Sequence, residues 1–326
     1  MPDFSAFVPE THRNISSGYV ETLIQARREE LFTGLIRLHY PSRENLVFTF
    51  LEGIQQKLYR CMDSTVDALP RHTWFHAVDQ SNSSVGFLAL PVEAMHFTRI
   101  AYEAPVNRVE SSLFTRDQLA DAAGKWFLEG DPSIVQLHTA DLNKYYLIAG
   151  HTAPIIEELS FSDGQARFSI GNASFPQNLP KVDYHVLRYV SNGGHEVWRE
   201  YDLRLAFNPL LRMLLNRFSE LAGRALTERL CEQLSLWART EGWNIAITSN
   251  GAVNRHYFDS LESAVAVYID LLRRFRDEAS QAIGARMVDG IAREILFRLD
   301  PYRRELLTQH IYSQDGVSSV AGLVWR

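Results

Sequence analysis

A segment in the first third of this chain returns in weakened form about a hundred positions later. Residues 34–53 read GLIRLHYPSRENLVFTFLEG, and residues 133–150 read SIVQLHTADLNKYYLIAG. In both segments an apolar strand leads through a polar turn into a second apolar strand that stops at glycine, and Leu38-His39 matches Leu137-His138. The repeat predicts that one structural unit is used twice in the N-terminal half.

Composition narrows the classes of protein that this chain can belong to. It has 326 residues, enough for two or three small domains, and its 46% hydrophobic and 22% charged residues are typical of globular proteins. A net charge of -6 weighs against a nucleic-acid partner or an anionic membrane surface. We expect no membrane span and no export signal, since there is neither a long apolar run nor a basic leader. The two cysteines, Cys61 and Cys231, fit a reducing cytoplasm.

Local patterns place a helix and a set of short strands in each copy of the repeat. In the first copy, Ser16 and Ser17 are expected to cap a helix that ends by Gly34, and the hydrophobic period then changes to two. In the second copy, Thr115 is expected to cap the corresponding helix. The predicted strands are 35–38, 46–51 and 54–59 in the first copy, and 134–138, 145–149, 155–161 and 166–170 in the second. A further strand is predicted over 86–90, and 92–102 is ambiguous between strand and helix.

The C-terminal part has the periodicity of helices. Apolar residues at three-four spacing run from Phe207 to Trp237 and predict one long amphipathic helix. A hairpin is predicted over 244–258, followed by a helix that begins at a capping box formed by Asp259 and Glu262. Two more helices are expected, the last at Asp300-Pro301. The fold class is therefore α+β, with two related helix-plus-antiparallel-meander units before a helical bundle that contains a β-hairpin.

The segment 171–181 holds two prolines and a glycine with little periodicity, and it is the predicted boundary between the two halves. The expected domains are 1–112, 113–180 and 181–326.

Residues 18–60 resemble the PATAN-type domain, a family named after the N-terminal region of a cyanobacterial response regulator. The matching residues are Thr33-Gly34-Leu35-Ile36-Arg37-Leu38 and Phe48-Thr49-Phe50-Leu51-Glu52-Gly53-Ile54. The resemblance implies a bacterial signalling or scaffolding module that binds proteins, often in pathways of surface motility and response regulators, and it supplies no catalytic residues. The second copy departs from the pattern at Ser133 and at Ala149-Gly150. Residues 200–326 match no family that we recognise.

No motif in the chain has the spacing of a phosphate loop, a metal cluster or a nucleophile elbow. His39 and His138 occupy matching positions, which we interpret as the rim of a duplicated fold. Asp183, His185, His195 and Glu196 flank a turn without the spacing of a known ligand motif. The sequence therefore predicts no catalytic residue, no cofactor and no metal.

The features that suggest a function are surfaces. The apolar stripe from 207 to 237 needs a partner, which is either the chain's own later helices or another protein. The arginines at 273, 274 and 276 could contact an acidic partner, although an amphipathic helix would place them toward solvent. The apolar C-terminal tail could fold back as a strand or dock on a partner. The predicted interaction surface comprises Leu211, Leu215, Phe218, Arg273, Arg274, Arg276 and Trp325.

We therefore expect a non-enzymatic, cytoplasmic bacterial regulator or scaffold that acts through protein-protein association. The expected partner is a protein such as a response regulator or a small GTPase, and homodimerisation is a further expectation. One alternative is a sensor that holds a small molecule near Tyr257, Phe258 and Tyr268. A second alternative is an enzyme whose site is assembled from scattered residues.

Overall fold

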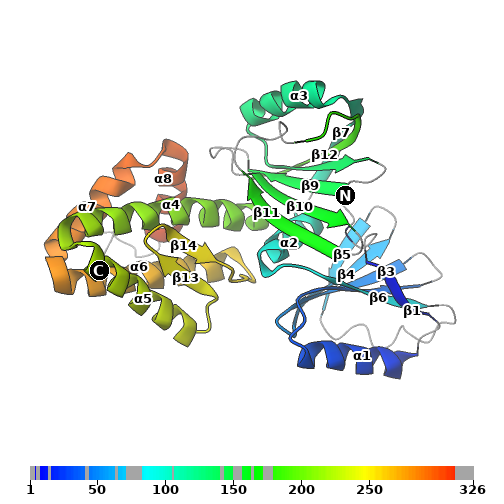
Figure 1. The fold of residues 1–326 in the computed structure, drawn as a ribbon, viewed down its shortest axis with the longest axis horizontal. Coiled ribbons are helices and arrows are strands. Elements are labelled where there is room, and N and C mark those ends of the chain that lie inside the picture. The colour runs from blue at the N-terminus through cyan, green and yellow to red at the C-terminus, as the bar shows by residue number, and fades with distance from the viewer. Residues whose placement is uncertain are drawn as a thin grey trace. The chain divides into compact units, whose positions relative to one another are not determined.

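The computed structural model describes residues 4, 8–13, 16–40, 44–62, 65–70, 83–104, 106–139, 143–149, 156–162, 165–171 and 179–312. The chain divides into two compact units, 1–198 and 199–326. The first unit contains two six-stranded antiparallel sheets, and the second is mostly helical with a two-stranded hairpin (Figure 1). The predicted α+β class is confirmed.

The first sheet is built around the segments that carry the family resemblance. Its core forms where α1 packs on one face of the sheet, through Val20 and Ile24 against Ile36, Phe48 and Phe50. Ser16 caps α1, because its side chain accepts a hydrogen bond from the backbone N–H of Tyr19. The strand order is β1-β6-β2-β3-β4-β5. The elements are β1 (Glu10–Arg13), α1 (Ser17–Glu29), β2 (Gly34–His39), β3 (Glu44–Leu51), β4 (Ile54–Met62), β5 (Thr65–Leu69) and β6 (Ser84–Ala89).

The second sheet has the strand order β11-β10-β9-β8-β12-β7. Helix α3 packs on it through Leu119, Ala123 and Trp126, and a capping box at Thr115 begins that helix as predicted. The elements are β7 (Val106–Phe114), α3 (Arg116–Glu129), β8 (Ser133–His138), β9 (Asn143–Ile148), β10 (Ile156–Ser162), β11 (Gln165–Gly171) and β12 (Tyr184–Ser191).

The two sheets have one topology. Read from β7, the second order is β7-β12-β8-β9-β10-β11, which repeats the first order with every strand six places later. Local details correspond as well. Ser16 and Thr115 both cap the helix, and Leu31 and Gly130 both follow it with a left-handed φ. The internal repeat expected from the sequence is therefore present in the strand order.

A cation–π contact occupies the same place in both copies with its two partners exchanged. In the first copy, the Arg27 guanidinium of α1 lies 4.7 Å from the centre of the Phe87 ring on β6. In the second copy, Arg188 on β12 lies 5.3 Å from the Trp126 ring on α3. The contact between helix and strand is the same in both copies, but the cation and the aromatic ring have changed places. An alignment of the two copies by residue identity therefore misses this correspondence.

The helix between the two sheets occupies the segment that was ambiguous in sequence. A 3₁₀ turn, η3 (Val92–Ala94), leads into α2 (Met95–Glu103). Phe97 and Tyr102 contact Phe4, and Tyr102 also contacts Tyr59 of β4. Every residue of α2 from Met95 to Tyr102 is buried. Polar and apolar positions of this helix are buried alike, so the segment shows no simple period.

The boundary between the compact units lies later than the linker suggests. β12 pairs with β7 on one side and with β8 on the other, so it lies inside the second sheet. β7 likewise belongs to the second sheet, although the predicted domain limit at 112 divides it. The compact units separate at 198 and 199, within the first turn of α4 (Glu196–Ala222). The sequence gives no signal for this position, because long-range strand pairing decides it.

The second unit corrects two predictions about helix ends. The predicted single helix from Phe207 to Trp237 is two helices, α4 and α5 (Arg224–Thr240), because Gly223 adopts φ 88° and ψ 162° between them. The cap of α6 (Leu261–Ile283) is Ser260, paired with Ser263, in place of Asp259 and Glu262. Asp300 caps α8 (Pro301–Leu307) as predicted. The remaining elements are β13 (Ile245–Thr248), β14 (Gly251–Asn254), α7 (Ala285–Arg298) and a π-helical turn, η4 (Thr308–Tyr312).

None of the helices in the described ranges is both long enough and apolar enough to cross a membrane.

Candidate functional site

The apolar stripe of α4 and α5 is the core of the second unit. Leu211, Leu215 and Phe218 are almost completely buried, together with Leu230 and Leu234 of α5. Side chains of α6 and α7 cover them, because the same cluster includes Leu271, Phe275 and Ile291. Of the two occupants considered for this stripe, the structure places the chain's own helices on it, so these three residues do not form an exposed surface.

The arginines of α6 each lie beside a carboxylate. Arg273 contacts Asp270 at 3.3 Å and Arg274 contacts Glu278 at 2.7 Å, both within α6. Arg276 donates to Asp289 of α7 from Nε, at 2.9 Å. Because each of the three arginines lies beside a carboxylate, they do not form a basic patch on α6. Trp325 lies outside the described residues.

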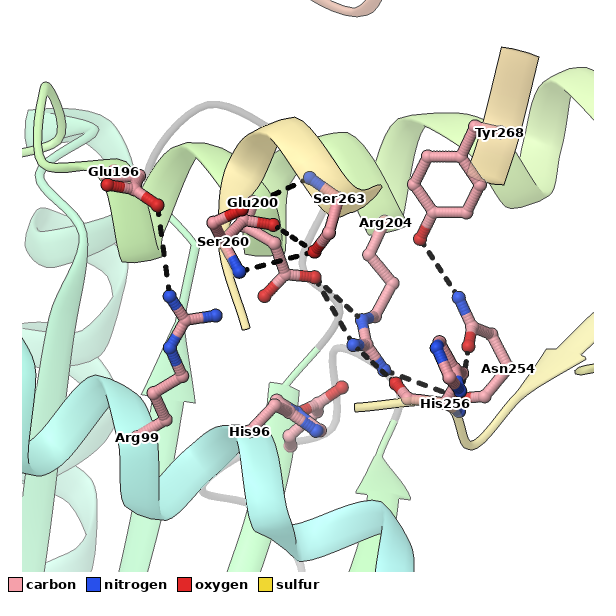
Figure 2. A network of polar contacts seen from close by, with 11 residues as sticks. His96, Arg99, Glu196, Glu200, Arg204, Asn254, His256, Ser260, Ser263 and Tyr268 are labelled. Carbon is pink, nitrogen blue, oxygen red and sulfur yellow. Dashed lines mark hydrogen bonds and ion pairs between the residues drawn. The ribbon is translucent and has the colours of Figure 1, made fainter. Parts of the chain in front are cut away.

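A buried polar network holds the hairpin of the second unit against α4 (Figure 2). Arg204 is its centre: the guanidinium Nη2 lies 3.2 Å from Oε1 of Glu200 and donates to the backbone carbonyl of His256 at 3.0 Å. A further Arg204 N–H reaches the carbonyl of Asn254, and the guanidinium lies 5.3 Å from the centre of the Phe258 ring. Glu200 is buried, so the network neutralises its charge within the protein.

The aromatic residues proposed as a ligand pocket pack on one another. Phe207 stacks on Tyr268 with ring centres 4.1 Å apart, and the Phe258 ring meets Tyr268 at 5.5 Å. The Tyr268 hydroxyl accepts a hydrogen bond from Asn254 Nδ2 at 2.9 Å, and burial raises the pKa of Tyr268. Tyr257 is only partly buried. The rings occupy the space that a ligand would need, so this cluster serves packing.

The direction of the pKa shift at His256 predicts that the second unit loses stability in acid. Burial, followed by the positive charge of Arg204, lowers the pKa of His256, and burial likewise lowers the pKa of His310. In the unfolded chain a histidine binds its proton with a pKa of about 6.5. Below that pH the unfolded state therefore holds more protons than the folded state, and acidification favours unfolding.

We expect urea unfolding of the helical unit to require less denaturant at about pH 5 than at about pH 7.5. Far-ultraviolet circular dichroism measures this, because most helical residues lie in that unit. His256→Asn should reduce the difference between the two pH values, whereas His195→Asn in the first unit should leave it unchanged. An equal pH dependence in wild type and His256→Asn would contradict the assignment.

The first unit contains a buried network around α2. His96 Nε2 lies 2.5 Å from Glu157 Oε2 of β10, with both side chains buried. On the next turn, Arg99 donates to Glu103 at 3.0 Å, and the Tyr59 hydroxyl donates to the same carboxylate at 2.7 Å. These contacts connect α2 to both sheets. Each of these contacts joins two residues of the first unit, which is the behaviour of structural polar contacts.

The ion pair of α2 has a counterpart of opposite polarity in α4. Each helix follows the sixth strand of its copy, and each has a pair at i and i+4: Arg99 with Glu103, and Glu200 with Arg204. Both pairs begin four positions after the first residue of the helix. The correspondence between the copies therefore extends into α4, although acid and base have changed places.

Three of the histidines that were considered as metal ligands, His39, His138 and His185, lie on strands of the two sheets. His39 Nδ1 lies 2.9 Å from Asn45 Oδ1, and His138 Nδ1 lies 2.5 Å from Asn143 Oδ1, so the two copies share this pair. His185 is opposite His138 in the register of β12 and β8. Among the described residues, no group of three His, Cys, Asp or Glu side chains is arranged to hold a metal ion.

A hollow of about 530 Å³ runs along α1. Its described lining comes from that helix alone and consists of Glu21, Thr22, Ile24, Gln25, Ala26, Arg28 and Glu29. A hydrolytic or transfer site needs a nucleophile or base held near a second group, and one helix face with these residues does not provide it.

Two helix corners of the helical unit, which our sequence reasoning missed, are built alike. Residues 221–227 read LAGRALT and residues 282–288 read AIGARMV. The two glycines adopt similar backbone angles, φ 88° and ψ 162° at Gly223 and φ 84° and ψ 143° at Gly284, a region that other residues rarely enter. Each glycine turns one helix directly into the next. The shared signal was a glycine with an apolar residue three positions later.

The two corners expose apolar side chains at matching positions. Leu226 is 43% exposed and Met287 is 51% exposed, while the next residues, Thr227 and Val288, are buried. Leu221 is exposed beside the first corner. We call Leu221, Leu226 and Met287 the end surface.

Both corners lie at one end of the helical unit. Phe207 stacks on Tyr268 and Phe218 contacts Phe275, so α4 and α6 run in the same direction and finish at the same end. Thr227 and Val288 are buried, whereas Leu226 and Met287 before them remain in solvent, so the two corners present an apolar side chain in the same way.

Comparison with known proteins gave no match to any family model, curated protein or solved structure.

Proposed function

We propose that this protein is a non-catalytic regulator or scaffold that binds another protein through the end surface of its helical unit. The observation that carries the proposal is the repeated exposure of an apolar side chain at Leu226 and Met287. Single exposed apolar side chains are common on protein surfaces, so the weight lies on the matching positions of these two at one end of the unit, where they can serve as apolar anchors for a partner. The surface replaces the buried stripe as the site of association.

The chemistry of the buried groups favours association over catalysis. Glu200, Arg204 and Tyr268 form contacts within the chain, as do His96 and Glu157. A catalytic acid or base must instead reach a substrate from the wall of a cleft. The ring contacts among Phe207, Phe258 and Tyr268 also weigh against a small-molecule sensor at that cluster.

The proposed partner is a protein of a bacterial two-component or motility pathway, such as a response regulator or a small GTPase. This class comes from the resemblance of residues 18–60 to PATAN-type domains. Self-association through the same surface is the second candidate, since apolar anchors serve both kinds of interface.

Photocrosslinking in the cells that produce the protein tests the proposal. A photoreactive amino acid is placed singly at Leu226, at Met287 or at Leu236, which is 61% exposed near the other end of α5 and serves as the control. We expect a discrete protein adduct from Leu226 and from Met287 and none from Leu236. Equal crosslinking at all three positions, or none at the first two, would contradict the proposal.

A further inference from the structure

The first sheet has a strained, apolar tip. It consists of residues 30–33, which follow α1, and residues 51–54, the hairpin turn between β3 and β4. Among the described residues other than glycine, Leu31 (φ 53°) and Glu52 (φ 50°) are those with a positive φ, and both are in this tip. A left-handed backbone costs such residues about 1 kcal/mol or more. Strain of this kind gathers where a function requires it.

The two loops of the tip are joined by two hydrogen bonds, one between backbone groups and one to a side chain. The Gly53 N–H donates to the carbonyl of Phe32, and the Glu52 N–H donates to the Thr33 hydroxyl, each at 2.9 Å. A Cβ at Gly53 would lie 2.4 Å from the carbonyl oxygen of Arg28, so the hairpin turn is pressed against the end of α1. The tip is therefore a rigid, preorganised surface.

Leu31 is a poor residue for its backbone position. The N–H of Leu31 donates to the carbonyl of Arg28 and that of Phe32 to the carbonyl of Arg27, which is the Schellman ending of a helix. Glycine is favoured at this left-handed position, and the second copy has Gly130 there. The first copy thus keeps a leucine where glycine would be more stable.

Leu31 does not contribute its side chain to the hydrophobic core. Leu31 is 67% exposed and Ile54, on the adjoining loop, is 64% exposed. Phe32, the residue after Leu31, is the one that packs against the core of the first sheet. Two large apolar side chains therefore stand in solvent on a rigid support, which is the arrangement of a recognition surface.

The charges around the tip select the kind of partner. Glu29, Glu30 and Glu52 are exposed. Arg27 pairs with Glu30 and is turned onto the Phe87 ring, which leaves Arg28 as the exposed cation of residues 27–33 and 51–54. Residues 27–33 and 51–54 therefore carry three carboxylates against two guanidinium groups, a net charge of -1, and this negative surplus beside the apolar anchors complements an apolar segment flanked by lysine or arginine.

We propose that the tip of the first sheet binds a basic amphipathic peptide segment of another protein, with Leu31 and Ile54 as its anchors. The site is separate from the end surface and does not depend on it. Its partner is defined by chemistry: one or two large apolar side chains next to Lys or Arg.

Selection from a phage-displayed library of short random peptides on the immobilised full chain tests this site. We expect enriched peptides that combine Leu, Ile or Phe with Lys or Arg. In fluorescence anisotropy, Leu31→Gly and Ile54→Ser should each weaken the binding of a selected peptide about tenfold or more. Leu31→Gly should also raise the midpoint of thermal unfolding, because it relieves the left-handed leucine.

The matched control is Leu128→Ser, at an 89% exposed leucine on α3 of the second copy, and it should change peptide affinity by less than about twofold. Leu226→Ser should likewise leave peptide binding intact, which separates this site from the end surface. The proposal is overturned if no peptide is enriched, if the enriched peptides are acidic, if Leu31→Gly retains full affinity, or if that variant unfolds at a lower temperature.

Discussion

Replacing Arg204 by methionine is expected to destabilise the helical unit by about 3–5 kcal/mol. The methionine keeps much of the stem but removes the charge that neutralises buried Glu200, and it removes the N–H groups that bind the carbonyls of Asn254 and His256. A carboxylate left in the interior without its cation accounts for most of the loss. Urea unfolding followed by circular dichroism measures it.

Arg224→Met is the matched control, because Arg224 and Glu228 form an i, i+4 pair on α5 whose side chains are 89% and 52% exposed. Exposed pairs of this kind contribute little to stability. If Arg204→Met costs no more than Arg224→Met, the Glu200 carboxylate is solvated and the network is not a structural support of the hairpin.

The second large effect is expected at Leu215. This side chain has 0% exposure in the core of the helical unit, so Leu215→Ala should cost about 2–5 kcal/mol through lost burial and the cavity that remains. Leu226→Ala on the end surface should change stability by about 0.5 kcal/mol or less. Denaturant titration of both variants under one condition makes the comparison.

The same pair of variants distinguishes core from interface. Should Leu215→Ala leave stability unchanged and instead alter the oligomeric state, the stripe of α4 would be an intermolecular surface, and the arrangement of α6 and α7 over it would be incorrect. A large loss of stability with an unchanged subunit number is the expected outcome.

Sequence reasoning predicted elements whose signals are local. The caps at Ser16, Thr115 and Asp300 are confirmed, since a side chain that accepts from a nearby backbone N–H is encoded within four residues. The echo of Leu38-His39 at Leu137-His138 predicted the repeated units, because those residues lie in equivalent strands, β2 and β8.

Features that depend on distant contacts were not predictable in this way. The pairing of β12 with β7 and β8 decides where the first unit ends, and nothing within 171–181 encodes it. The exchange of partners between Arg27–Phe87 and Arg188–Trp126 hides the similarity of the copies from residue matching.

The candidate sites were missed for a related reason. An apolar stripe indicates a need for burial without saying what covers it, so Leu211, Leu215 and Phe218 were assigned to a surface that the chain covers itself. Leu31 is recognisable as unusual only when its φ of 53° is known.

Native mass spectrometry of the protein isolated from the cells that produce it, compared with a Leu226→Ser/Met287→Ser variant, tests the central claim most directly. The account predicts a stoichiometric protein partner or a second copy of the chain on the wild type, and the loss of that subunit in the variant at unchanged stability. A bound small molecule with no protein partner, or a complex that persists in the variant, would contradict association through the end surface.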